Sequence, residues 1–178
     1  MIKEIERVLI SRQEIETKIN ELAKQISTDY AGKDLVLVGV LKGGFVTLAD
    51  LMRQITIPID MDLIAVSSYG SKTESSGVVR MVKDLDISIE KKHVLIIEDI
   101  IDSGLTLSYL VENLKTRHPL SVKICAFLNK PDRRKVGIKV DYTGFMIPDE
   151  FVVGYGLDYN NKYRQLADIC ILDPEVYK

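Results

Sequence analysis

The chain contains 178 residues and carries a formal net charge of −2, with a pI near 5.8. Hydrophobic residues make up 46% and charged residues 28%. This balance excludes an intrinsically disordered chain and suits a single domain, 1–178, with one sizeable core. Because an acidic protein offers no basic field to attract nucleic acid, we expect no nucleic-acid partner.

The N-terminus predicts neither a signal peptide nor a membrane-spanning helix, because it is charged from Lys3 onward and has no long apolar stretch. We therefore expect a cytoplasmic protein with no membrane partner. Cys125 and Cys170 lie in apolar, strand-like runs, which predicts buried free thiols. With only His93 and His118 in addition, neither a zinc cluster nor a cysteine–histidine nucleophile is expected.

The first predicted element is a helix that begins after Ser11. Ser11 and Glu14 form a capping-box pattern. Apolar residues follow at helical spacing, namely Ile15, Ile19, Leu22 and Ile26. Residues 35–41 then read LVLVGVL, an apolar run that predicts a buried strand.

A glycine-rich loop, Lys42-Gly43-Gly44, follows this strand and leads into a second predicted helix. The apolar face predicted for that helix consists of Phe45, Leu48, Met52 and Ile55. Two interpretations of the loop are equally good: a simple turn with a solvated lysine, or a ligand-binding loop at the carboxyl edge of a sheet.

Two further strands are predicted at 59–66 and 78–82. The segment between them, Ser67 to Gly77, is polar and rich in serine and glycine. Composition alone favours a surface connector between two hairpin strands.

The most informative stretch runs from Val94 to Ser108 and reads VLIIEDIIDSGLTLS. Its four apolar residues predict a strand buried on both faces, with Glu98 and Asp99 at the strand's end. A tight loop, Asp102-Ser103-Gly104, then leads into a helix. The apolar face predicted for this helix consists of Leu107, Leu110, Val111 and Leu114.

In an open α/β sheet, such a junction between strand and helix binds ligands. The backbone N–H groups, the flexible glycine and the hydroxyls of Ser103 and Thr106 can bind a phosphate. Three carboxylates would repel that phosphate, so we assign Glu98 and Asp99 to sugar hydroxyls or Mg²⁺, and Asp102 to accepting a proton. This combination predicts a ribose 5-phosphate site. In the alternative interpretation, these acids only solvate the strand end and cap the helix.

The last predicted strands are 121–128 and 168–172, and between them lie a basic run, Asn129 to Lys135, and the block Asp149 to Tyr159. By charge alone the basic run is a solvated loop, with a phosphate or nucleic-acid patch as the second interpretation. Alternating strands and helices predict the α/β class, with a mainly parallel sheet flanked by helices.

The string E-D-I-I-D-S-G-x-T after an apolar strand resembles the phosphoribosyl pyrophosphate motif of type I phosphoribosyltransferases. Lys130 and the block DEFVVGYGLDY at 149–159 are similar to segments of the hypoxanthine-guanine phosphoribosyltransferases of that family, in their short bacterial form. The resemblance extends to about Asp173. It implies a mainly parallel twisted sheet flanked by helices, a small base-binding hood region at about 130–178 and a flexible lid loop at about 67–80.

The resemblance also implies how the donor and the metal are held. Lys42, Gly43 and Arg164 would bind the pyrophosphate of the donor, and the peptide bond before the lysine can be cis. Glu98 and Asp99 would hold the ribose hydroxyls and Mg²⁺. The segment Ser103-Gly104-Leu105-Thr106 would hold the 5-phosphate, although relatives often carry a polar residue where this chain has Leu105.

The base would be recognised by residues later in the chain. Lys130 would donate to O6 of a 6-oxopurine, Phe151 would stack on the purine, and the backbone of Val152 would bond the base edge. Asp158 would lie near the base amino group and a second Mg²⁺. Two further residues, Ser68 and Tyr69, match a mobile lid that closes over the site.

The implied reaction joins the phosphoribosyl group of phosphoribosyl pyrophosphate to N9 of hypoxanthine or guanine, giving IMP or GMP and pyrophosphate. Asp102 would accept or hold the N7 proton of the base. Relatives are homodimers or homotetramers. A regulatory protein on the same scaffold, sensing the donor and binding RNA or DNA, is the alternative from a different class. Among other bases, the Lys130 and Phe151 arrangement disfavours uracil. Lys130 has donors and no acceptor, so it also favours an oxo group over the amino group of adenine, whereas xanthine is not excluded.

Overall fold

The structure is a computed structural model that describes residues 3–69 and 78–177. The helices are α1 (Arg12–Asp29), α2 (Gly44–Gln54), α3 (Leu105–Lys115) and the short α4 (Pro174–Tyr177), with a 3-10 turn, η1 (Pro131–Arg133). The strands are β1 (Ile5–Ile10), β2 (Leu35–Leu41), β3 (Asp60–Tyr69), β4 (Val78–Lys83), β5 (His93–Ile101), β6 (Ser121–Asn129), β7 (Tyr142–Met146), β8 (Val152–Val153) and β9 (Ile169–Leu172).

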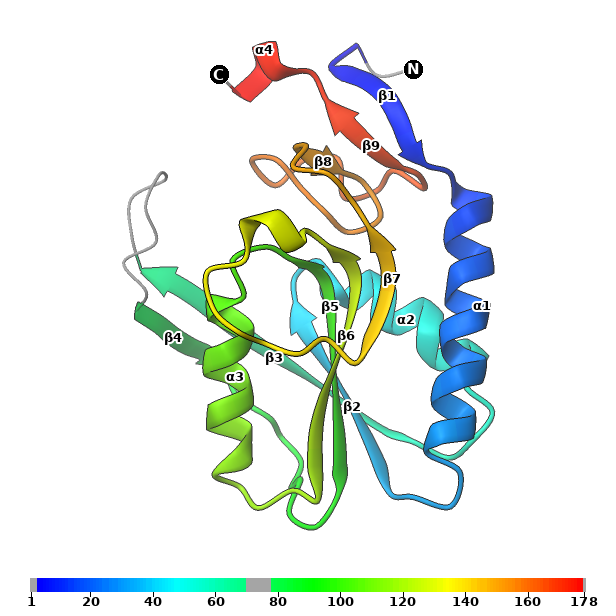
Figure 1. Cartoon of the computed structure of the whole chain (residues 1–178), viewed down its shortest axis with the longest axis vertical. Helices are drawn as coiled ribbons and strands as arrows, with labels where there is room; N and C mark the ends of the chain where they lie inside the picture. The colour runs from blue at the N-terminus through cyan, green and yellow to red at the C-terminus, as the bar shows by residue number, and fades with distance from the viewer. Residues whose placement is uncertain (1–2, 70–77, 178) are drawn as a thin grey trace.

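The main sheet has six strands in the order β4-β3-β2-β5-β6-β7. Its pairings are parallel except for the hairpin of β3 and β4. The predicted α/β class, with a mainly parallel sheet flanked by helices, is therefore confirmed. Strand β5 lies in the interior of the sheet, between β2 and β6 (Figure 1). The sheet thus presents the ends of β2 and β5 side by side.

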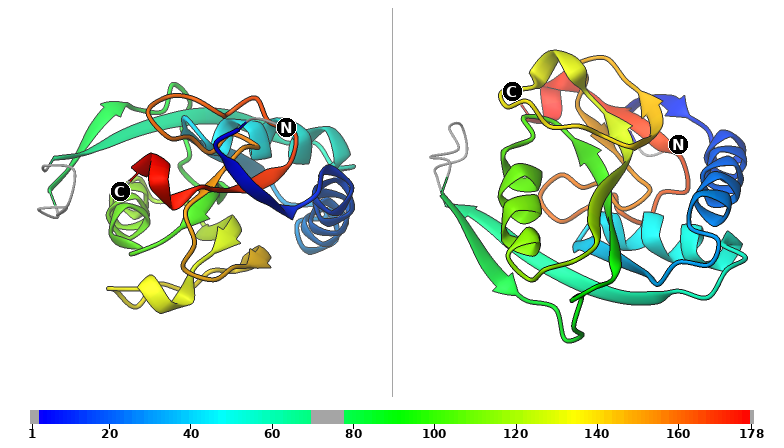
Figure 2. Two further views of the ribbon diagram at one scale, coloured as in Figure 1. Left: turned by 90° about the horizontal axis from the view of Figure 1, so that it is seen from above. Right: turned by 60° about the horizontal axis from the view of Figure 1, so that its bottom comes forward.

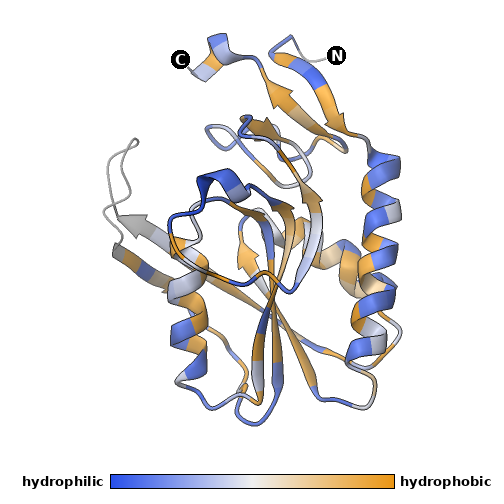
Figure 3. Ribbon diagram, in the orientation of Figure 1, coloured by the Kyte–Doolittle hydropathy of each residue, from blue (hydrophilic) through white to orange (hydrophobic). Residues whose placement is uncertain are grey.

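Helices cover the two faces of this sheet, and the alternation of side chains along β2 shows how (Figures 1 and 2). Leu35 and Leu37 belong to the core cluster that contains the apolar residues of α1 and α2. Val36 and Val38 belong to the cluster that contains the apolar residues of α3. Because both faces are covered, β2 is apolar throughout, as the hydropathy colouring of the strands shows (Figure 3).

A second sheet of three strands, β1-β9-β8, lies over the carboxyl ends of the main strands (Figure 1). We call it the hood sheet. The sequence pattern predicted no strand at β1, which pairs antiparallel with β9 near the other end of the chain. The N-terminal strand and the C-terminal region therefore together form the cover of the site.

Two local predictions were wrong. Strand β5 does not end at Glu98, because its pairing with β6 continues to the partners Ile101 and Asn129. In α2, Phe45 is 48% exposed, whereas Thr47 is fully buried together with Leu48 and Leu51. The predicted face was wrong only at Phe45, since Leu48 is buried and Met52 and Ile55 pack against the core. Helix α2 packs on both β5 and α1, and Thr47 and Leu51 are buried there in place of Phe45.

Other local predictions are confirmed. Helix α1 has the predicted capping box at Ser11 and Glu14. Cys125 and Cys170 are free and buried. Within the part of the chain that the structure describes, no helix is both long and apolar enough to cross a membrane.

The burial of β5 predicts the effect of a core substitution. Leu95 is completely buried, so Leu95→Ala is expected to lower the free energy of unfolding by about 2–5 kcal/mol. Leu120, which is 62% exposed, provides the matched control, and Leu120→Ala should change stability by less than about 0.5 kcal/mol. Urea unfolding measures both, and comparable losses would contradict the assignment of β5 to the core.

Candidate active site

Predicted site residues of β5, and of the loop and helix that follow it, line one cavity at the carboxyl edge of the main sheet. This cavity has a volume of about 280 Å³. The predicted residues on its wall are Glu98, Asp99, Asp102, Ser103, Gly104 and Thr106, and Leu41 joins them from β2. The strand, the tight loop and the helix N-terminus thus form one concave surface.

Glu98 and Asp99 form a pair of buried carboxyls in this wall. Glu98 is 9% exposed. Burial, followed by the neighbouring Asp99, raises the pKa of Glu98 well above its usual range, and burial also raises the pKa of Asp99. The Asp99 carboxylate also accepts the N–H of Ile100 at 2.8 Å. A cation or hydroxyl donors at this pair would favour its charged form.

Gly43 lies directly against the Asp99 side chain. A Cβ atom at position 43 would collide with the Asp99 carboxylate. The loop after β2 therefore reaches the acidic pair only because residue 43 has no side chain. Lys42, which precedes it, is exposed, and the peptide bond between Leu41 and Lys42 is cis, as the resemblance implied.

The number of carboxylates at this cavity fits a Mg²⁺ site. Among residues 3–69 and 78–177, no three carboxylate, cysteine or histidine side chains gather at a single point. Mg²⁺ does not need such a cluster, because proteins commonly bind it through one or two carboxylates together with substrate phosphates. Glu98 and Asp99 supply that number of carboxylates.

The loop before α3 has the features of a phosphate site. Gly104 adopts a left-handed conformation with φ of 82°, which favours glycine. No side chain of the described residues caps α3, and its first turn contains no acidic residue. The N–H of Leu105 donates to Ser103 Oγ at 3.4 Å, whereas the N–H groups that follow it in the first turn have no side-chain cap and can donate to an anion.

Asp102 contacts an arginine that the sequence analysis did not single out. The Nε of Arg133 lies 3.0 Å from Asp102 Oδ1, and its Nη1 lies 3.2 Å from Asp149 Oδ2. Arg133 belongs to the basic run after β6, where charge alone cannot show which cation faces the site. In this structure it links the predicted proton acceptor to the predicted base-binding block.

Lys130 is placed in the same region. Its side chain is buried, with the residue 9% exposed, and its Nζ donates to the carbonyl oxygen of Glu150 at 2.6 Å. Its backbone N–H donates to the carbonyl of Ile101, the last residue of β5. The Lys130 backbone is therefore bound to the end of β5, next to Asp102 in the chain.

Phe151 lies at the rim rather than in the core, with 36% of its surface exposed. Its ring stacks on Tyr177 of α4, with 4.8 Å between the centroids, and meets the edge of Tyr159. Val152 follows in β8, where it pairs with Ile171 of β9. Tyr177 was missed because nothing near the end of the chain marks it as a neighbour of Phe151.

Asp158 and Arg164 were predicted separately and form an ion pair, with Nη2 and Oδ1 2.5 Å apart. Arg164 Nη1 also donates to the carbonyl of Gly156. A Cβ atom at Gly156 would lie 2.6 Å from the carbonyl oxygen of Gly43, so these two loops are in contact. The structure thus places Arg164 on the same side of the site as the Lys42 loop.

The predicted lid is only partly described. Ser68 and Tyr69 end β3, where their backbones pair with Val79 and Val78 of β4. Residues 70–77, the centre of the predicted lid, lie outside the described residues.

Comparison with known proteins agrees with this geometry. The model of the phosphoribosyl transferase domain matches residues 9–160. The fold is therefore that of a phosphoribosyltransferase.

Similarity to individual proteins is closer still. The hypoxanthine-guanine phosphoribosyltransferase of Bacillus subtilis is 51% identical over 178 residues, covering 100% of this chain and 99% of the relative. That of Mycobacterium avium is 50% identical, covering 98% and 89%. A crystal structure of a hypoxanthine phosphoribosyltransferase from Staphylococcus aureus has a TM-score of 0.95 at 47% identity, covering 98% and 95%. This chain belongs to the hypoxanthine-guanine phosphoribosyltransferase family.

The raised pKa values of Glu98 and Asp99 predict that this pair lowers stability as the pH rises. Well below pH ~4 the carboxyls are protonated in the folded and unfolded states, so they have no effect. At higher pH the unfolded chain releases protons that the folded chain retains, so stability falls. Glu98→Gln should therefore raise the melting temperature at pH ~8 by roughly 2–4 °C, equivalent to about 1 kcal/mol, and leave it unchanged near pH ~3.5.

Asp62→Asn provides a control, because it should change the melting temperature in the opposite direction to Glu98→Gln. Asp62 is 7% exposed, and burial by itself would raise its pKa. Three backbone N–H groups and the Lys83 ammonium outweigh burial and lower this pKa. The resulting stability is present at neutral pH and is lost in acid, so Asp62→Asn should lower the melting temperature mainly at pH ~8. Thermal unfolding of both variants, followed by circular dichroism between pH ~3.5 and ~8, measures these changes in melting temperature. An effect of Glu98→Gln that does not depend on pH would contradict the prediction.

Proposed function

We propose that this protein is a purine salvage enzyme that transfers the 5-phosphoribosyl group of phosphoribosyl pyrophosphate to N9 of hypoxanthine or guanine. The products are IMP or GMP and pyrophosphate. The observation that carries the proposal is the single cavity in which a phosphate-binding loop, an adjacent pair of carboxylates and Asp102 meet. The family supports it, since the relatives named above are hypoxanthine-guanine phosphoribosyltransferases.

The donor is held by the loops after β5 and β2. The N–H groups at the start of α3, with Ser103, Gly104, Leu105 and Thr106, bind the 5-phosphate. Glu98 and Asp99 accept hydrogen bonds from the ribose hydroxyls. Lys42, Gly43 and Arg164 bind the pyrophosphate, because ammonium, backbone N–H and guanidinium groups are all donors to its oxygens.

Mg²⁺ completes this part of the proposal. Glu98 and Asp99 would hold one ion, and Asp158 would hold a second. When bound, Mg²⁺ lowers the negative charge that the leaving pyrophosphate develops. The protein's own cations, Lys42 and Arg164, act on the same oxygens and orient the leaving group.

The base binds between Asp102, Lys130 and the rim. Asp102 accepts the N7 proton while N9 bonds to the sugar, and Lys130 donates to O6. Phe151 stacks on the ring, and the Val152 backbone bonds its edge. Both Asp102 and Lys130 have protein partners in this structure, Arg133 and the Glu150 carbonyl. When the base binds, Asp102 exchanges Arg133 for the N7–H of the base, and Lys130 exchanges the Glu150 carbonyl for O6.

Closure of the lid that includes Ser68 and Tyr69 excludes water from the sugar during transfer. We also propose that the protein is cytoplasmic and forms a homodimer or homotetramer. The net charge of −2 argues against a nucleic-acid partner.

A turnover assay tests the proposal directly. The protein is incubated with phosphoribosyl pyrophosphate, Mg²⁺ and one base at a time, and nucleotide formation is followed. Hypoxanthine and guanine should both give product, and adenine and uracil should not. Donor binding without turnover on any base would instead support a regulatory protein that senses the donor.

Substitution of Asp102 tests the acid–base role. Asp102→Asn is expected to lower kcat by about 10²–10⁴-fold, because the amide cannot accept the N7 proton. Donor binding, measured by calorimetry, should change little. Asp132→Asn removes a neighbouring exposed carboxylate and should leave kcat unchanged. A normal rate for Asp102→Asn would remove Asp102 from this role.

Substitution of Lys130 tests base recognition. Lys130→Ala removes a charged donor to O6, so kcat/KM for hypoxanthine and guanine should fall by about 10–100-fold at saturating donor. The inhibition constant of adenine against hypoxanthine should not rise, because adenine has no O6. Lys135→Ala, at an exposed position of the same basic run, should change neither quantity. A loss that affects all bases equally would show that Lys130 does not read O6.

A further inference from the structure

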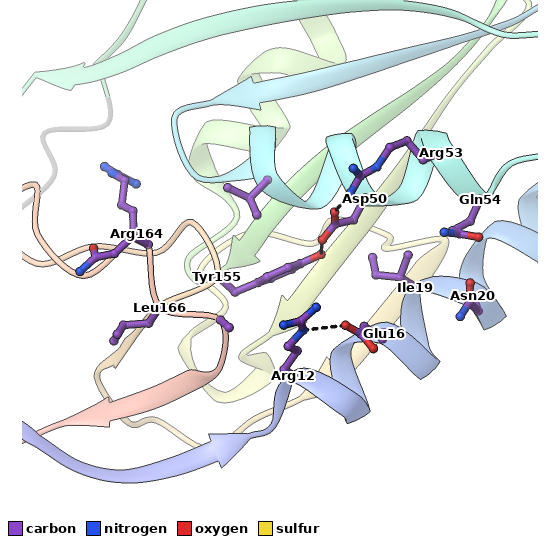
Figure 4. Close-up of a pocket in the computed structure, with 13 residues that line it drawn as sticks. Arg12, Glu16, Ile19, Asn20, Asp50, Arg53, Gln54, Tyr155, Arg164 and Leu166 are labelled. Atoms are coloured by element: carbon purple, nitrogen blue, oxygen red, sulfur yellow. Dashed lines mark hydrogen bonds and ion pairs between the residues drawn. The ribbon is translucent and has the colours of Figure 1, made fainter. Parts of the chain in front are cut away.

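Tyr155 connects the loop that follows β8 to helix α2 (Figure 4). The residue is 7% exposed, and its hydroxyl donates to Asp50 Oδ2 at 2.9 Å. Asp50 also forms an ion pair with Arg53, one turn further along α2. The Tyr155 ring packs on Phe127 of the main sheet, with 5.1 Å between the centroids. Both ends of the side chain are therefore fixed, the ring by packing on Phe127 and the hydroxyl by a partly buried hydrogen bond.

The backbone around Tyr155 is unusual and depends on such an anchor. Gly154, Tyr155 and Gly156 all have positive φ, at 95°, 49° and 94°. Tyrosine adopts this conformation rarely, whereas its glycine neighbours have many alternatives. The side-chain contacts of Tyr155 therefore select one conformation of a segment that glycines would otherwise leave free.

This segment holds Arg164 at two points. The Gly156 N–H donates to the carbonyl of Arg164 at 3.1 Å, and Arg164 Nη1 donates to the carbonyl of Gly156 at 2.5 Å. Next to it, the Tyr155 N–H donates to the carbonyl of Leu166 at 2.8 Å. The position of the guanidinium thus follows the position of residues 155 and 156.

The same segment also touches the other pyrophosphate-binding loop. The Gly156 backbone lies against the carbonyl of Gly43, immediately before α2 begins at Gly44. Asp50 lies six residues further along α2, about 9 Å along the helix axis. Contacts at Gly43 and at Asp50 attach the segment to α2 at two separated points, which fixes its orientation as well as its distance.

We propose that Tyr155 is a positioning residue for the transfer reaction: its hydroxyl, bound to Asp50, holds Arg164 at the separation from the Lys42–Gly43 loop that pyrophosphate requires. This inference rests on the proposed function. Tyr155 is not among the residues that line the cavity containing Glu98 and Asp102, and its hydroxyl faces a separate pocket of about 600 Å³ between α1, α2 and the 164–167 segment (Figure 4). It therefore acts through Arg164.

Tyr142 offers a matched control. It is 3% exposed, and its hydroxyl donates to Asp29 Oδ2 at 2.8 Å. This bond joins β7 to the end of α1, and neither residue lines the cavity of the site. Tyr142→Phe and Tyr155→Phe each delete one partly buried hydrogen bond from tyrosine to carboxylate, so both should lower the melting temperature by similar amounts.

Kinetics separates the two variants. Tyr155→Phe should raise the KM for phosphoribosyl pyrophosphate, and the Kd for Mg²⁺-pyrophosphate measured by calorimetry, by about tenfold. Its KM for hypoxanthine should stay within about twofold of wild type, because the base contacts other residues. Tyr142→Phe should leave all three constants unchanged. Burial raises the pKa of Tyr155, so the hydroxyl remains a donor and the effect should be constant between pH ~6 and ~9.

Substitution of the acceptor completes the test. Asp50→Asn keeps an oxygen for the Tyr155 hydroxyl and should retain near-wild-type donor KM, whereas Asp50→Ala should match Tyr155→Phe. The double variant of Asp50→Ala and Tyr155→Phe should be no worse than either single variant.

Two outcomes would overturn the inference. One is an equal donor KM for Tyr155→Phe and Tyr142→Phe, and the other is an equal rise of the KM for donor and base in Tyr155→Phe. Wild-type protein without turnover would count against the proposed function instead, and pyrophosphate titration of the same variants would still decide the role of Tyr155.

Discussion

The site depends on a pair of adjacent carboxyls, Glu98 and Asp99, which the central strand β5 places away from solvent. Burial raises the pKa of both, so their charged form is unfavourable in the folded protein. The sheet tolerates them because β5 is paired on both sides and covered by helices on both faces. A site that costs stability in this way is typical of function, because its charged form needs a ligand.

Much of the fold and of this site could be predicted because the signals are local. The apolar runs of β2 and β5, the capping box of α1 and the contiguous residues 98–106 need no knowledge of distant partners. The pairing of β1 with β9 could not be predicted, because it joins the two ends of the chain. On α2, Phe45 was wrongly predicted to be buried, because spacing alone cannot show how the helix is turned against β5 and α1, where Thr47 and Leu51 are buried instead.

Partners within the site were unpredictable for a related reason. The run Lys130 to Lys135 contains four cations, and sequence pattern gives no means to see that Arg133 pairs with Asp102 while Lys130 turns to the Glu150 carbonyl. The bond of Tyr155 to Asp50 likewise joins residues more than 100 positions apart. Residue types were predictable, whereas their pairing needed the fold.

On the proposed function, the hydrogen bond between Lys130 and the Glu150 carbonyl explains how the site selects among purine bases. Lys130 already donates to a carbonyl oxygen, so an incoming base must offer an oxygen at least as good. O6 of a 6-oxopurine replaces one carbonyl acceptor by another. The amino group of adenine offers no such acceptor, and Lys130 would lose a bond without gaining one. The choice between bases thus depends on the hydrogen bond from Lys130 to the Glu150 carbonyl, which breaks when a base binds. Only a base with an oxygen that replaces this carbonyl restores the bond.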